Sequence, residues 1–92
     1  MTEFRALKKH MEDGKIVWVY VMPLGKTVGF RMNRDDLISC IKSLQYKFYT
    51  WVHDGTRSKV LVTKNEKGEE FLCSAYLNLP EENLNEIPEA EE

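Results

Sequence analysis

A continuous run of strand-forming residues at 15–22, KIVWVYVM, constrains the fold of this chain more than any other feature. Alternate side chains of an extended strand point to opposite faces of a sheet. One set here is Ile16, Trp18, Tyr20 and Met22, and the other set consists of three valines, so both faces are apolar. Such a run is typical of a central strand whose two faces are both covered.

Turn and capping signals predict the next two elements. The proline and glycine of residues 23–26 favour a tight turn, which predicts a hairpin between the first strand and a second strand at 27–32. Asn33, followed by two aspartates in the first turn, is typical of a capped helix start. The predicted buried stripe of this helix is Leu37, Ile38, Cys40, Ile41 and Leu44.

Three more strands are predicted after the helix, at 46–52, 59–64 and 69–76. The Asp-Gly pair within 53–57 and the Asn-Glu-Lys-Gly stretch at 65–68 favour tight connections between them. These segments therefore predict an antiparallel meander.

The first residues carry a weaker pattern. Phe4, Leu7 and Met11 share one helical stripe, and Gly14 is a stop signal. We therefore expect a short N-terminal helix or arm at 1–13. The predicted fold is α+β: an antiparallel sheet in the order (α)-β-β-α-β-β-β, with the central helix packed on one face.

Length and charge predict how the chain is organised. Ninety-two residues suffice for one small domain, which we place at 14–80. Residues 81–92 hold six of the fifteen acidic residues and none of the thirteen basic ones, so they form an acidic C-terminal tail beside a basic body. Such asymmetry accompanies interaction tails and nucleic-acid contact, but it also keeps small proteins soluble.

The composition also predicts the compartment. No apolar run approaches the roughly 18 residues that a membrane helix needs, and residues 1–14 lack the apolar segment of a secretory signal. We therefore expect a cytoplasmic protein without membrane contact, whose two cysteines stay reduced.

Two interpretations of the C-terminal stretch, LNLPEENLNEIPEAEE, stay open. Leu79, Leu84 and Ile87 are isolated apolar anchors, and they would let the stretch wrap the domain before it frays after Pro88. Alternatively, Leu84 and Ile87 form a short linear motif that contacts a partner.

Several segments together resemble a small bacterial and phage-borne family that is catalogued only as a domain of unknown function. They are GKIVWVYV, RDDLISCIK, YTWV, GEEFLCS and NLNEIP. The family combines an N-terminal hairpin, a helix and a meander with an Asn-Leu-x-x-Leu-Pro-like closing stretch. Asn83, Leu84, Ile87 and Pro88 would occupy that stretch, with isoleucine where the family more often has leucine. The resemblance implies a fold and a phage or prophage origin, and no activity.

Residues with catalytic or metal-binding chemistry are few and scattered. His10 and His53 are far apart in sequence, and Cys40 and Cys73 lie in separate predicted elements, which disfavours a metal site. A thiol on an apolar helix face keeps a high pKa and reacts slowly. No glycine-rich phosphate loop is present. We therefore expect no enzymatic activity, no cofactor, no metal and no small-molecule substrate.

The stretch YKFYTWVHDGTR, residues 46–57, contains the candidate binding residues. If the helix covers the face of Phe48, the alternate residues lie on the open face of the sheet. The candidate site residues are Lys47, Tyr49, Trp51, His53, Arg57 and Lys59.

Two classes of partner suit this face. Aromatic residues are frequent anchors in protein interfaces, so we expect a protein partner or a second copy of the chain in a homodimer. The alternative is single-stranded nucleic acid, which binds basic grooves with exposed aromatic rings.

Overall fold

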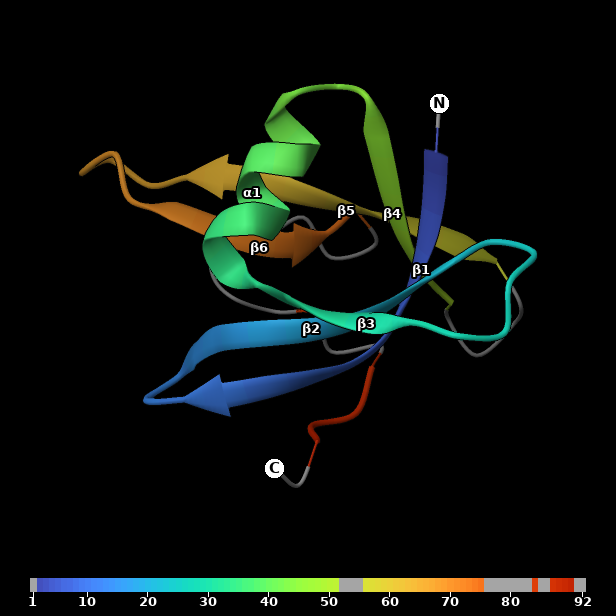
Figure 1. Cartoon of the computed structure of the whole chain (residues 1–92). Coiled ribbons are helices and arrows are strands. Elements are labelled where there is room, and N and C mark those ends of the chain that lie inside the picture. The colour runs from blue at the N-terminus through green and yellow to red at the C-terminus, as the bar shows by residue number, and fades with distance from the viewer. Residues whose placement is uncertain (1, 52–55, 76–83, 85–86, 91–92) are drawn as a thin grey trace.

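The computed structural model describes residues 2–51, 56–75, 84 and 87–90, and these form a curved sheet with one short helix (Figure 1). The order of the six strands across the sheet is β3-β2-β1-β4-β5-β6. The elements are β1 Thr2–Glu12, β2 Lys15–Pro23, β3 Phe30–Asn33, α1 Arg34–Lys42, β4 Tyr46–Trp51, β5 Arg57–Lys64 and β6 Glu70–Ser74.

The prediction of an N-terminal helix at 1–13 is wrong, because Thr2–Glu12 form β1, which is the longest strand of the described residues. β1 pairs with β2 on one side and with β4 on the other, so it lies at the centre of the sheet. An isolated helix of this length is marginal in water, whereas two strand neighbours pair the backbone on both sides. Phe4 and Ala6 alternate into the core as expected of a strand.

The prediction of a purely antiparallel sheet is also wrong, because β1 and β4 run parallel, with Phe4 opposite Phe48. Parallel neighbours cannot be joined by a tight turn and need a long crossover. Here the crossover consists of β2, β3 and α1, and it carries the chain from one side of β1 to the other. The sheet is therefore mixed, and the domain is mostly sheet.

β2 is a central strand, as its sequence predicts, because it lies between β1 and the edge strand β3. Its strict alternation is broken, however. Met11 pairs with Ile16 and His10 pairs with Trp18, so Val17 is the extra residue of a β-bulge. The bulge turns Ile16 to the core side with Val19 and Val21, although simple alternation places Ile16 with Trp18.

The helix α1 begins where the capping signal predicts. The side-chain oxygen of Asn33 accepts a hydrogen bond of 2.8 Å from the backbone N–H of Asp36. Leu37 and Ile38 are buried against the sheet, but the prediction that Leu44 completes the buried stripe is wrong. Leu44 follows the last turn of the helix, and it is 77% exposed.

The core lies between α1 and the face of the sheet that carries Phe4 and Phe48. These two rings are stacked, with centroids 5.0 Å apart, where β1 and β4 run side by side. The helix packs against β2, β3, β4 and β5, so the sheet curves around it (Figure 1). The opposite face, which we call the outer face, is the one that carries Tyr49 and Trp51.

The C-terminal segment completes the core, as the wrapping interpretation predicts. Leu84 and Ile87 are buried, at 0% and 6% exposed. β4 accompanies β1 only as far as Arg5, and beyond that point Glu89 forms a parallel bridge with Lys9. The backbone N–H of Ala90 donates to the Lys9 carbonyl, so the pairing extends past Pro88, where fraying was expected. Leu79 lies outside the described residues.

Lys9 itself is buried, at 7% exposed, on the core side of β1. Its ammonium group donates hydrogen bonds to the carbonyl oxygens of Leu84, at 2.6 Å, and Ile87, at 3.1 Å. A buried charge is costly unless it is hydrogen-bonded, and backbone carbonyls meet that need here. The described part of the closing stretch therefore has a structural role.

Candidate functional site

The outer face of the sheet carries alternating aromatic and basic side chains. Cross-strand partners point to the same face, so the strand registers decide which residues share it. Among the described residues of this face, the large aromatic side chains are Trp18 and Tyr20 of β2 and Tyr49 and Trp51 of β4. Its basic residues include Arg5, Lys8, Arg31, Lys47, Arg57 and Lys59, and its acids include Glu3 and Glu12.

Each of the four rings has a cation above it. The guanidinium carbon of Arg5 lies 4.6 Å from the ring centre of Trp51, and that of Arg31 lies 4.3 Å from the ring centre of Trp18. Such contacts are worth about 0.5–1 kcal/mol where they are exposed. The remaining pairs are Lys8 over Tyr20 at 5.5 Å, Arg57 over Tyr49 at 5.1 Å and Arg57 over Trp51 at 5.8 Å.

Glu3 contacts both members of one of these cation–ring pairs, Tyr49 and Arg57. The Tyr49 hydroxyl donates a 3.1 Å hydrogen bond to one carboxylate oxygen of Glu3, and Arg57 lies 3.9 Å from the other. Burial raises the pKa of Tyr49 above its ordinary value, and the hydrogen bond to Glu3 raises it further. The Tyr49 hydroxyl therefore stays protonated, and its hydrogen bond to Glu3 fixes the orientation of the ring between β1 and β5.

The structure brings five of the six predicted site residues to the outer face: Lys47, Tyr49, Trp51, Arg57 and Lys59. The sixth, His53, lies outside the described residues. Sequence reasoning missed Arg5, Lys8 and Arg31, and it did not connect Trp18 and Tyr20 with this surface. Only the registers of β1 and β3 reveal these neighbours, and the first of these strands was expected to be a helix.

A layer of cations over aromatic rings has a definite chemical preference. Guanidinium groups donate paired hydrogen bonds to phosphates and carboxylates, and their flat faces stack on planar groups. The rings beneath them offer π-faces once a cation moves aside. The outer face is therefore suited to a ligand that combines negative charge with flat apolar groups.

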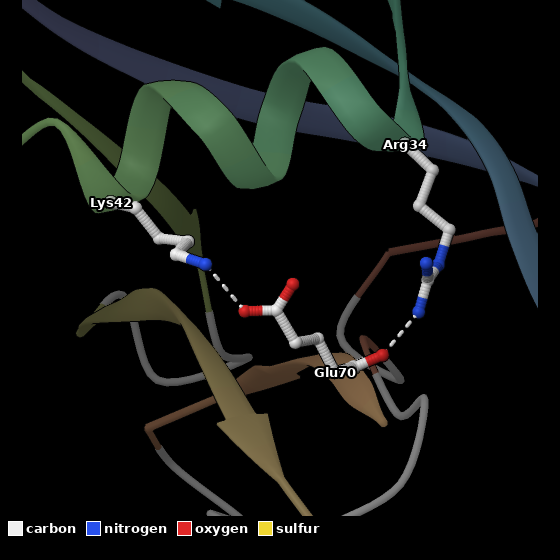
Figure 2. A network of polar contacts seen from close by, with 3 residues as sticks. All are labelled: Arg34, Lys42 and Glu70. Atoms are coloured by element: carbon white, nitrogen blue, oxygen red, sulfur yellow. Dashed lines mark hydrogen bonds and ion pairs between the residues drawn. The ribbon is translucent and has the colours of Figure 1, made fainter. Parts of the chain in front are cut away.

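A shallow groove of about 680 Å³ on the helix side is a second candidate. Arg34 and Lys42, at the two ends of α1, both reach Glu70 on the edge strand β6 across this groove (Figure 2). The Lys42 ammonium lies 2.7 Å from the Glu70 carboxylate, and Arg34 donates to the Glu70 carbonyl. The hydrogen bond from Lys42 lowers the pKa of Glu70. These charges are engaged in attaching the helix to the sheet.

The cysteines have little reactive character. Burial raises the pKa of Cys40, and the nearby Asp36 carboxylate raises it further. Cys73 is fully buried, and its sulfur lies 3.8 Å from the Thr63 hydroxyl oxygen. Among the described residues, no three His, Cys, Asp or Glu side chains gather closely enough to hold a metal ion. No helix in the same part of the chain has the length and apolar character needed to cross a membrane.

Comparison of the chain with family models, with curated proteins and with solved structures gave no match. The resemblance to a bacterial and phage-borne family therefore stays an expectation. What the chain does has to be inferred from the geometry of its surfaces.

Proposed function

We propose that this protein is a non-enzymatic binding domain whose outer face binds single-stranded nucleic acid. The observation that carries the proposal is the pairing of four described aromatic rings on that face, those of Trp18, Tyr20, Tyr49 and Trp51, with cations, across strands β3 to β5. Proteins that bind single strands combine basic groups that follow the phosphates with rings on which the bases stack.

The same observation weakens the argument for a homodimer or a protein partner. That argument requires exposed apolar rings in need of a second cover. Trp51 is already half-buried, and its ring lies beneath Arg5 and Arg57. A second copy would bring the same basic groups against one another, because a twofold interface places identical patches face to face. A single-stranded nucleic acid carries negatively charged phosphates, so these basic groups would attract it instead of repelling it.

Titration of a fluorescently labelled oligothymidylate tests the proposal, with anisotropy as the measurement. Binding should weaken between about 50 and 200 mM salt, because each phosphate contact releases a counterion. Arg57→Gln should reduce the slope of log affinity against log salt by about 0.7, which is the contribution of one single-strand phosphate contact. Lys67→Gln, in the exposed turn before β6, is the matched control and should leave the slope unchanged.

The aromatic component has a separate test. Trp51→Ala should lower the affinity about 5-fold to 150-fold, which corresponds to the roughly 1–3 kcal/mol that one base contributes by stacking. Phe30→Leu removes a ring from the opposite face and should leave the affinity unchanged. Absence of saturable binding at low salt would overturn the proposal. Equal affinity for a polyglutamate peptide would favour a protein partner, and a species of twice the 10.8 kDa chain mass that Trp51→Ala dissociates would favour a dimer.

A further inference from the structure

The hydrogen-bonded pairing between β4 and β5 covers only part of the length of the two strands. Three residue pairs join them, from Trp51↔Arg57 to Tyr49↔Lys59. β4 begins three residues earlier, at Tyr46, and β5 continues to Lys64 in contact with β6 instead. The two strands therefore diverge toward the C-terminal end of α1, and a cavity of about 320 Å³ opens between them. We call this cavity the slot.

The described residues that line the slot are apolar or basic, and none of them is acidic. Its apolar residues are Ile41, Leu44, Tyr46, Phe48, Val60, Leu61 and Val62, and its basic residues are Lys42, Lys47 and Lys59. Lys42 is bound to Glu70. Lys47 and Lys59 also line the slot, and neither forms an ion pair with another described residue.

Leu44 at the slot has two unusual properties. Its φ of 64° is in the left-handed region, where glycine usually ends a helix because other residues are strained there. Its side chain is also 77% exposed, although it borders an apolar cavity. A leucine at this position therefore costs stability twice, through its backbone and through its exposure. The cost of exposure is reduced if an apolar ligand occupies the slot and covers the Leu44 side chain.

We propose that the slot binds an amphipathic monocarboxylate, a straight-chain fatty acid of medium length. The apolar chain lies between Leu44 and Val62, and the carboxylate accepts hydrogen bonds from Lys47 and Lys59. The volume is at the small end of the range for small-molecule pockets, about 300–1,000 Å³, which favours a single acyl chain over a peptide. The slot shares Lys47 and Lys59 with the outer face, whereas Leu44 and Val62 lie outside that face, so the Leu44→Gly test does not depend on nucleic-acid binding.

Calorimetric titration with decanoate tests the proposal on the full chain. Leu44→Gly should lower the affinity for decanoate by about tenfold or more, since one or two lost apolar contacts have this effect in a hydrophobic pocket. The same variant should melt no lower than the parent, because glycine relieves the left-handed backbone. Val28→Ala, which trims an exposed side chain in the β2–β3 loop, is the control and should change neither quantity.

The head group has its own test. The double variant Lys47→Gln with Lys59→Gln should weaken decanoate by about tenfold or more, the loss expected for hydrogen bonds to a charged group. Decanol lacks the carboxylate, so its binding to the double variant should equal its binding to the parent. Lack of saturable decanoate binding would overturn the proposal, as would binding that neither Leu44→Gly nor the double variant weakens. Tighter binding of an acidic apolar peptide than of decanoate would assign the slot to a protein segment instead.

Discussion

The burial of Leu84 leads to a prediction that separates a structural C-terminal segment from a partner-binding motif. Leu84 is 0% exposed and belongs to the same cluster as Phe4, Val19 and Leu37. Truncation of a fully buried leucine to alanine costs about 2–5 kcal/mol, through the lost transfer free energy and the cavity left behind. If the truncation made Leu84 and Ile87 leave the core together, the loss could not exceed what their burial contributes.

Docking of the segment buries Leu84 and Ile87 together. Each such side chain contributes about 1.5–3 kcal/mol when it is fully buried, so the limit set by detachment is about 3–6 kcal/mol. We therefore expect Leu84→Ala to lower the free energy of unfolding by about 3 kcal/mol. A domain of this size loses about 4–8 °C of melting temperature per kcal/mol, which gives a decrease of about 12–24 °C.

Thermal and urea denaturation followed by circular dichroism measure this effect. The matched control is Leu44→Ala, which removes the same atoms from a leucine that is 77% exposed. Such a surface change should stay within about 0.5 kcal/mol of the parent. If Leu84→Ala melts within about 4 °C of the parent chain, Leu84 does not belong to the core, and the linear-motif interpretation of residues 77–92 is favoured.

Three further substitutions probe other contacts. Lys9→Met keeps the aliphatic stem but leaves two carbonyls of the C-terminal segment without their donor, so urea denaturation should show a loss of about 1–3 kcal/mol. Glu70→Gln should destabilise the chain at neutral pH and not in acid. The pKa of Glu70 is lowered on folding by Lys42, so its stabilisation exists above the unfolded pKa of about 4.3 and disappears as the pH falls through the folded value; melting temperatures of parent and variant measured from pH 7 downward should converge. Gly29→Ala should lower the melting temperature, because the added methyl group would overlap the carbonyl oxygen of Val21, and an unchanged value would mean that the loop shifts freely.

Local signals explain which elements were predictable. The helix start at Asn33 depends on a hydrogen bond to a residue three positions away, and the run at 15–22 carries its own strand pattern. The parallel pairing of β1 with β4 has no such signal, because Thr2 and Tyr46 meet only after a hairpin and a helix have intervened. The spacing of Phe4, Leu7 and Met11 fits a helical stripe equally well, and tertiary pairing decides the outcome.

The candidate site also has one part that the sequence predicts and another part that it does not. Alternation along β4 places Tyr49 and Trp51 on one face, and this placement needs only the knowledge that Phe48 faces the helix. The cations above those rings come from β1 and β5. Arg5 lies over the Trp51 ring because β1 and β4 pair in parallel, and no local sequence pattern predicts that pairing. The face on which the rings lie could therefore be predicted from the sequence, whereas the cations above them could be identified only from the register of the strands.

The two faces of β1 separate the residues of the core from those of the proposed binding surface. Its inward residues, such as Phe4 and Lys9, hold the core and the C-terminal segment. Its outward residues Arg5 and Lys8 contact rings of the neighbouring strands outside the core, and a contact of this kind contributes about 0.5–2 kcal/mol, depending on its burial. Substitutions on the outward side of β1 should therefore weaken the proposed nucleic-acid binding in a chain that still folds. Arg5→Gln is thus a better probe of that proposal than an inward change, and its melting temperature should stay close to that of the parent.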